Sequence, residues 1–252
     1  MNIINTNYII FHPYNKPIKQ KTTLLINKQA IKQTEYIKYL GLLIDSTLTW
    51  KYQIANISKK LSRSIGIMYK LRPFLPLPVM KSIYYSLAYS HINYGIEAWG
   101  SANKTELDKI LILQKRAIRI MTNNDKFPTI PGPLARSDPI FKKLELLKVE
   151  DIYNLQINKF IYKCLNHSAP INFENWFIKR TNIHNYNTRL NVNNGQFTNN
   201  LYYPYARTTN YGMKLIKVSS PRIWNQLPDN LRNKISLAKF MNYLKKFDLS
   251  HY

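Results

Sequence analysis

Residues 50–72 read WKYQIANISKKLSRSIGIMYKLR, and apolar side chains recur in this segment every three or four positions. The recurring positions are Ile54, Ile57, Leu61, Ile65 and Met68. An α-helix completes a turn every ~3.6 residues, so this spacing gathers them on one face and predicts an amphipathic helix. Pro73 follows and predicts the end of the helix, because proline donates no backbone hydrogen bond.

Further helices are predicted downstream by the same periodicity. They run from Pro76 and Pro78 through Tyr94, from a cap at Asn103 or Thr105 to Met121, from about Val149 to Asn166, and from a cap at Ser236 onward. The Pro-rich residues 123–138 predict a loop and a boundary. Residues 179–218 have no clear period, which predicts an irregular region with one short hairpin.

Residues 1–50 are predicted to form strands and turns. The expected elements are a buried strand at Tyr8–Phe11, a hairpin of Thr23–Ile26 and Ala30–Lys32 about Asn27-Lys28, and a strand at Tyr36–Ile44. Few residues remain to cover such a sheet, so we expect an exposed edge and face. The whole pattern predicts an α+β chain that is mainly helical.

Charge narrows the classes of partner. The 252 residues contain 37 Lys and Arg against 13 Asp and Glu, a formal net charge of +24. Such an excess repels itself in a compact chain and indicates a polyanionic partner. Nucleic acid is the first candidate, an anionic membrane surface the second and an acidic protein the third.

Several other classes are disfavoured. No apolar run approaches the ~18 to 20 residues that span a bilayer, and no secretory signal is visible, so we expect an intracellular chain that is not secreted. The single cysteine, Cys164, excludes a disulfide within the chain. Cys164 and His167 share a helical face, but without a second ligand pair a buried thiol beside a surface histidine is favoured over a zinc site.

Carboxylates offer little support for catalysis. Two-metal polymerase chemistry needs converging carboxylates, and the adjacent pair Glu150-Asp151 opens a predicted helix, where it favours the helix dipole. Asp45 follows an apolar strand, and its favoured role is to form a turn with Ser46 and Thr47. The five histidines are scattered and no Gly-rich phosphate loop occurs. The sequence therefore predicts binding, with no catalytic residue and no metal site.

The predicted helix after Trp50 has a basic face. Lys59, Arg63 and Lys70 fall within about 40° of one another at the helical period. No acid occurs between Trp50 and Arg72, whereas Lys51 and Lys60 add further positive charge. A solvated helix face is the alternative, but surface helices usually mix both signs, so phosphate contact is favoured.

Two weaker features accompany this face. Lys115, Arg116 and Arg119 form a second basic edge. Basic side chains whose stems cover the rim of an apolar core would give the same pattern, so this explanation is equally good. Tyr85 and Tyr89, one turn apart, could stack on bases, but a place in the core is favoured.

YLGLLID at 39–45, NYGIEAWG at 93–100, LQKRAIRI at 113–120 and PRIWNQLP at 221–228 are the most distinctive segments of the chain. With several shorter segments, and in this order, they resemble the reverse transcriptases of non-LTR (LINE-type) retrotransposons. YLGLLID at 39–45 with LTWK at 48–51 resembles the end of the palm, where the family has its primer grip. YYSL at 84–87, NYGIEAWG at 93–100 and LQKRAIRI at 113–120 resemble the thumb. HNYNTR at 184–189 and PRIWNQLP at 221–228 resemble the carboxy-terminal region.

The resemblance implies a fragment. The paired aspartates of the family's catalytic palm are missing, as no Asp-Asp occurs, and so are the fingers, the endonuclease and the Cys/His knuckle. Any Mg²⁺ is therefore expected only in the missing palm, and no cofactor is expected here. The resemblance places Tyr39, Leu40 and Gly41 in the primer-grip position.

The expected organisation has four parts. Residues 1–50 form terminal palm strands, 51–122 a helical thumb-like bundle, 123–138 a Pro-rich linker and 139–252 a mixed carboxy-terminal region. The expected function is binding of an RNA or DNA duplex, with a template-primer as the favoured duplex and a palm-containing chain as a candidate partner. The expected contacts are Lys59, Lys60, Arg63, Lys70, Arg72, Lys115 and Arg119. The alternatives are a basic peripheral membrane or scaffold protein and a non-functional remnant of a decayed mobile element.

Overall fold

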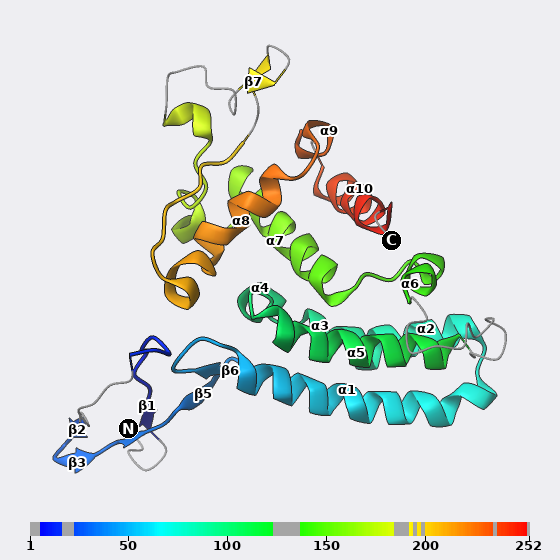
Figure 1. Cartoon of the computed structure of the whole chain (residues 1–252), viewed down its shortest axis with the longest axis horizontal. Helices are drawn as coiled ribbons and strands as arrows, with labels where there is room; N and C mark the ends of the chain where they lie inside the picture. Colours follow the sequence, from blue (N-terminus) through cyan, green and yellow to red (C-terminus); the bar gives the residue numbers. More distant parts are fainter. Residues whose placement is uncertain are drawn as a thin grey trace.

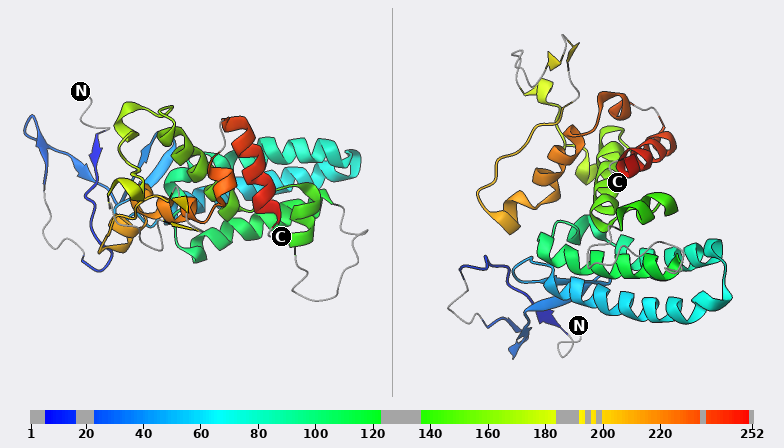
Figure 2. Two further views of the ribbon diagram at one scale, coloured as in Figure 1. Left: turned by 90° about the horizontal axis from the view of Figure 1, so that it is seen from above. Right: turned by 45° about the vertical axis from the view of Figure 1, so that its right-hand side comes forward.

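A computed structural model describes residues 6–16, 23–122, 137–183, 192–193, 196–197, 200–233 and 236–250. Within these ranges the chain is mainly helical with a few short strands, which confirms the predicted α+β class (Figure 1). The strands among residues 7–45 lie at one end of the molecule, beyond the amino-terminal end of the first long helix, whereas the short strands at 192–193 and 196–197 lie far from them (Figures 1 and 2).

The first group of helices follows the apolar periodicity. It comprises α1 (Lys51–Leu71), α2 (Leu77–Tyr84), α3 (Ser90–Asn93), α4 (Ile96–Trp99) and α5 (Lys104–Met121). In Figure 1, α1 and α5 run side by side in one direction and the α2–α3 segment returns in the other. All five apolar positions named in α1 are buried, with Ile54 and Met68 fully so. The predicted helix and its core face are therefore confirmed.

The returning segment contains a π-helical turn, Tyr85–Tyr89, between α2 and α3. The buried hydroxyl of Ser64 in α1 lies 2.8 Å from the carbonyl oxygen of Leu87 and donates to it. A π-turn disturbs the regular backbone pairing, so this bond satisfies a carbonyl that the turn exposes to the core. The apolar period does not reveal such an interruption.

Gln114 ties the helices together at the centre of the core. Its side chain is 1% exposed. Its Nε2 donates to Tyr84 Oη and to the carbonyl oxygen of Leu147, both at 2.8 Å. Its Oε1 accepts the amide of Val149 at 3.1 Å. A buried amide with all these partners fixes α2, α5 and the start of α7 in one arrangement.

A second group of helices packs on the first. It comprises α6 (Asp138–Leu144), α7 (Val149–Leu165), α8 (Ile216–Asn225), α9 (Asp229–Arg232) and α10 (Leu237–Ser250). Trp224 of α8 and Tyr162 of α7 both contact the ring of Phe240 in α10, at centroid distances of 5.8 and 4.8 Å. The right view of Figure 2 shows this group stacked against the α1–α5 group.

A side chain of α8 holds the segment that leads to it. Asn225 Nδ2 donates to the carbonyl oxygen of Leu201 at 2.9 Å, and its Oδ1 accepts the amide of Leu201 at 2.8 Å. One amide side chain thus pairs with the backbone of Leu201 as a neighbouring strand would. The irregular segment is therefore anchored on α8.

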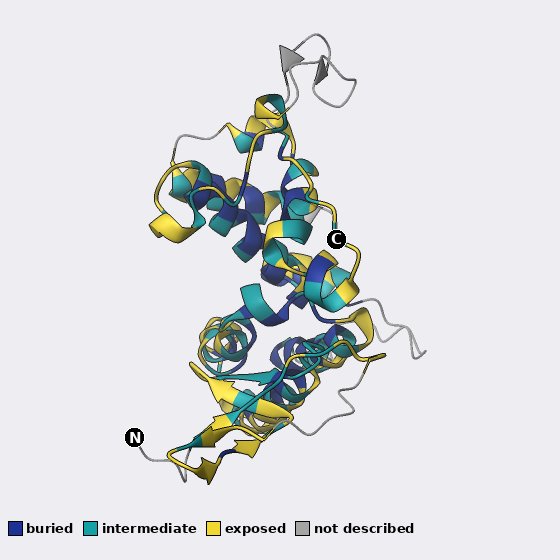
Figure 3. Cartoon of the chain, turned by 90° about the vertical axis from the view of Figure 1, so that its left-hand side faces the viewer, coloured by how far each residue is buried: buried dark blue, intermediate teal, exposed yellow. Residues whose placement is uncertain are grey.

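The described strands form four two-stranded sheets. β1 (Asn7–Tyr8) pairs in parallel with β4 (Lys32–Gln33), and the antiparallel pairs are β2 (Leu25–Ile26) with β3 (Gln29–Ala30), β5 (Tyr36–Tyr39) with β6 (Leu42–Asp45), and β7 (Val192–Asn193) with β8 (Gln196–Phe197). Most residues of β1–β5 are half-buried or exposed (Figure 3). The expected exposure is confirmed, but the described amino-terminal strands form separate pairs rather than one small sheet.

Two strand predictions are wrong. Tyr8–Phe11 is not a buried strand, because only Tyr8 of it lies in β1 and Phe11 is 47% exposed. Tyr36–Ile44 is a hairpin rather than one strand, because Leu40 and Gly41 adopt positive φ values and reverse the chain. The hairpin about Asn27-Lys28 is present, and so is a short hairpin between 179 and 218.

The remaining differences concern caps and boundaries. Asn103 occupies the residue before α5 but makes no capping hydrogen bond, since its Oδ1 accepts from Lys214. Thr105 lies inside the helix. Residues 123–136 of the expected linker and the segment 184–189 lie outside the described residues. The four-part division itself stays a prediction.

Candidate nucleic-acid interface

The β5–β6 hairpin ends in a two-residue turn made by Leu40 and Gly41. Their φ values are 45° and 81°, the left-handed pair that a tight antiparallel hairpin requires. The hydroxyl of Tyr94 donates to the carbonyl oxygen of Leu40 at 2.7 Å. A Cβ on Gly41 would lie 3.3 Å from the Tyr94 ring. The turn is therefore held against the end of α3.

The hairpin tip presents large side chains to solvent. Tyr39 and Leu40 are 60% and 73% exposed, and Tyr94 beside them is 56% exposed. Tyr39 and Leu40 belong to the predicted primer-grip position, and Tyr94 is the last residue of the helix predicted from Pro76 and Pro78. The structure places the three side chains together at one exposed edge.

Contacts with α1 fix the direction of the hairpin. Gln53 Oε1 accepts the amide of Leu43 at 2.9 Å. The rings of Tyr36 and Tyr52 lie 4.5 Å apart, and the Tyr52 hydroxyl donates to Glu35 at 2.8 Å. The hairpin consequently extends from the amino-terminal end of α1 (Figure 1).

Asp45 closes the junction between β6 and α1. Its carboxylate is 1% exposed. Oδ2 accepts from the Thr47 hydroxyl at 2.8 Å and from the amide and hydroxyl of Thr49 at 2.8 and 2.7 Å, and Oδ1 accepts the amide of Trp50 at 2.7 Å. Burial raises the pKa of Asp45, but these hydrogen bonds outweigh it and the pKa lies below its ordinary 3.8. The favoured turn-forming role is confirmed.

The basic side chains of α1 occupy its solvent side. Lys59, Lys60, Arg63 and Lys70 are all exposed, whereas Ile57, Leu61 and Met68 are buried on the opposite side. Among the described residues, no ion pair involves Lys59, Arg63 or Lys70. Three unpaired cations therefore point outward along one helix, which is the geometry that phosphate contact requires.

The other predicted basic residues are less exposed. Arg72 follows α1 in a short 3₁₀ turn and is half-buried, as are Lys115 and Arg119 of α5. Arg116 is exposed. This mixed burial fits the alternative in which the stems of Lys115 and Arg119 cover apolar surface. The α1 side chains are the stronger candidates.

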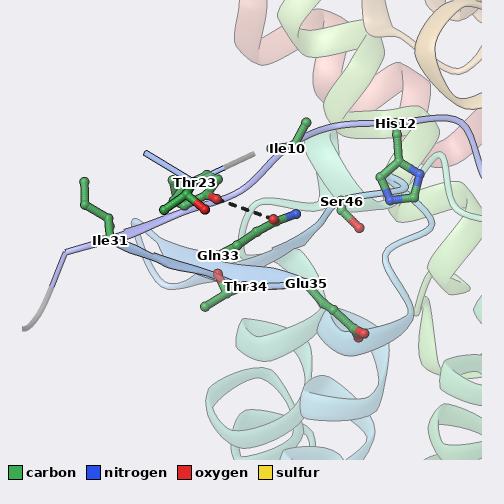
Figure 4. Close-up of a pocket in the computed structure, with 9 residues that line it drawn as sticks. Ile10, His12, Thr23, Ile31, Gln33, Thr34, Glu35 and Ser46 are labelled. Atoms are coloured by element: carbon green, nitrogen blue, oxygen red, sulfur yellow. Dashed lines mark hydrogen bonds between the residues drawn. The ribbon is translucent and has the colours of Figure 1, made fainter. Parts of the chain in front are cut away.

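A hollow of about 420 Å³ lies under the amino-terminal strands (Figure 4). Among the described residues, its lining contains Glu35 and His12 but no lysine or arginine. The Tyr8 hydroxyl donates to Gln33 at 3.4 Å across it. A carboxylate disfavours phosphate, and none of the basic candidates on α1 or α5 lines this hollow, so it is not part of the candidate interface.

The Cys164 and His167 side chains differ in exposure. Cys164 is buried, which raises its pKa to about 11, while the His167 side chain is 78% exposed and lies 3.8 Å from Glu174. Among the described residues no three His, Cys, Asp or Glu side chains gather as metal ligands would. Across the same residues, no helix combines the length and apolarity needed to cross a bilayer.

Asn210 and Tyr211 bind the backbone of the amino-terminal segment and of the β6–α1 junction. The hydroxyl of Tyr211 donates to the carbonyl oxygens of His12 and Ser46, the latter across a very short separation. Asn210 Nδ2 donates to the carbonyl oxygen of Thr47 at 3.1 Å. These bonds tie the carboxy-terminal region to the β6–α1 junction. Because the acceptors are backbone atoms, which every residue has, the sequence pattern does not predict these hydrogen bonds.

Comparison with curated proteins confirms the relationship that the motifs predict. The chain is similar to the RNA-directed DNA polymerase from mobile element jockey of Drosophila melanogaster, with 33% identity over 37% of this chain and 11% of the relative. It is also similar to a probable RNA-directed DNA polymerase from transposon X-element of the same species, with 25% identity over 57% of this chain and 16% of the relative. The jockey polymerase of Drosophila funebris is 28% identical over 42% of this chain and 12% of the relative.

These matches give the class of protein that the chain resembles. Part of the chain is similar to part of the RNA-directed DNA polymerases of mobile elements. Its matched part spans only about a tenth to a sixth of the length of those relatives. No model of a protein family and no solved structure matches it.

Proposed function

We propose that this chain binds the backbone of an RNA–DNA hybrid or other nucleic-acid duplex, as the thumb-like part of a mobile-element reverse transcriptase. The exposed side of α1 contacts the phosphates, and the hairpin tip at Tyr39, Leu40 and Gly41 meets the end of the duplex. The observation that carries the proposal is the single-signed face of α1, where Lys59, Arg63 and Lys70 are exposed. Phosphate contacts of this kind position a duplex without reading its sequence.

We further propose that the chain does not polymerise by itself. The sequence lacks paired aspartates, and its buried Asp45 is committed to four hydrogen bonds at the β6–α1 junction. The carboxylates and Mg²⁺ for phosphoryl transfer would belong to a palm in another segment or chain.

Charge reversal tests the binding proposal. The triple variant Lys59→Glu, Arg63→Glu, Lys70→Glu should weaken binding to a hybrid duplex by about 100-fold or more at low salt, because attraction becomes repulsion at three phosphates. Fluorescence anisotropy with a labelled hybrid measures the affinity.

A matched variant separates local from overall charge. Lys179→Glu, Lys239→Glu, Lys246→Glu changes the net charge by the same amount at exposed positions outside α1. It should weaken binding far less. Equal weakening by the two triple variants would reject the proposal, and preferential binding to anionic liposomes would favour a membrane surface instead.

A further inference from the structure

A cavity of about 400 Å³ lies at the base of α1, where four segments that are distant in sequence meet. Its wall includes residues of the β6–α1 junction, of α4, of the segment just before Phe177 and of the start of α8. Its apolar lining residues are Leu48, Trp50, Ala98, Trp176, Leu215 and Ile216. Small-molecule sites are mostly apolar hollows of roughly 300 to 1,000 Å³, so the size and lining fit a ligand.

The two tryptophans of the wall differ from the other two in the chain. Trp99 and Trp224 are 0% and 2% exposed and belong to the core. Trp50 and Trp176 are only half-buried. Aromatic rings with accessible surface in a hollow can stack on a planar ring, and tryptophan offers the largest such surface.

Two residues of this wall have a strained backbone. Leu48 and Trp50 have φ values of 50° and 65°, a left-handed conformation that is unfavourable for bulky residues. The Asp45 carboxylate holds this conformation by accepting the amides of Thr49 and Trp50. Strain of this kind is found at ligand clamps, where the surrounding structure maintains a side chain in a set position.

Asn210, Lys214 and Lys217 form another part of the wall, and hydrogen bonds fix the first two of them. Residues 209–213 form a π-helical turn, a rare element that is frequent at functional sites. Asn210 anchors this turn to Thr47. Lys214 donates to Asn103, and burial lowers its pKa. Lys217 also lines the cavity but is exposed, which leaves its ammonium for an anionic group.

We infer that this cavity binds an unpaired base of a nucleic-acid strand, with the base beside Trp50 and Trp176 and its phosphate on Lys217. This inference rests on the proposed function, which brings a strand to α1, and it adds a site for a nucleotide outside the duplex. Aromatic rings for the base with a cation for the backbone are the usual combination in single-strand binding.

The test compares two hybrid duplexes, one blunt and one with a single-stranded overhang, bound to the full chain. The overhang should increase affinity about 5- to 100-fold, the range for one base–aromatic stack. Two variants, Trp176→Ala and the cavity-filling Ala98→Phe, should each remove most of this gain. Both should retain the wild-type affinity for the blunt duplex, which also shows that they fold.

Photocrosslinking locates the base. An overhang that carries 5-iodouracil should crosslink to peptides containing Trp50 or Trp176, and Lys217→Ala should lower the yield. Excess adenosine monophosphate distinguishes two sources of the base. If it lowers the crosslinking yield, the site also takes free nucleotides; if it does not, the site takes only a base of a bound strand. Both outcomes are compatible with a base site once the crosslink is found.

The possible failures are distinguishable. If the chain binds neither duplex, the proposed function is rejected and this inference with it. If it binds both duplexes with equal affinity, or if the two cavity variants weaken both equally, only the base site is rejected.

Discussion

At the scale of single residues, Asp45 organises the base of α1. A carboxylate that is 1% exposed loses its hydration, and it remains charged here because three neighbouring residues donate four hydrogen bonds to it. Those bonds shape the β6–α1 junction and hold Trp50 at a positive φ. One side chain thus sets both the direction of the hairpin and a wall of the cavity.

Replacement of Asp45 by Asn should destabilise the fold by roughly 2–4 kcal/mol, because an amide cannot accept at both of its positions and its NH₂ would face donors. Urea denaturation at pH 7 measures this change. The pKa of Asp45 is lower in the folded state than its ordinary 3.8. Its contribution is therefore complete above pH 3.8 and is lost as the pH falls further. The variant should lack that acid-dependent loss; an unchanged acid dependence would contradict this role.

At the scale of elements, the local pattern predicts helices better than it predicts the hairpin. The apolar positions of α1 identify its bounds and its buried face because both follow from a period within one segment. The sequence predicts one strand at Tyr36–Ile44, because a leucine at position 40 does not indicate a left-handed backbone conformation. The reversal needs Gly41 at φ 81° and Tyr94 to hold the turn, and only the fold brings Tyr94 there.

Gly41→Ala tests the turn. The new Cβ would strain a φ of 81° and lie 3.3 Å from the Tyr94 ring, so the hairpin should lose roughly 1–2 kcal/mol of stability. Hydrogen exchange should quicken across residues 36–45 and stay unchanged in α5.

Gly66→Ala in α1 is the matched control. A Cβ there meets no atom within 4 Å, and alanine favours a helix, so this change should stabilise the chain by about 0.5–1 kcal/mol. Equal effects at the two glycines would show that the turn has no special requirement.

At the scale of the whole molecule, the basic face of α1 can be predicted from the sequence, whereas the cavity is visible only in the folded structure. The basic face depends on Lys59, Arg63 and Lys70 within one helix, so helical geometry alone indicates it. The cavity depends on Trp176 and Lys217 meeting the β6–α1 junction. That meeting is fixed by bonds such as Tyr211 to Ser46, which join residues 165 positions apart and end on backbone carbonyls.

The most direct test of the account is the salt dependence of hybrid-duplex binding by the wild type and by the triple variant Lys59→Ala, Arg63→Ala, Lys70→Ala. Each phosphate contact contributes about 0.9 to the slope of log affinity against log salt concentration. We predict that the slope of the variant is shallower by about 2.7. An identical slope for the two proteins would show that these side chains do not contact phosphates and would contradict the account.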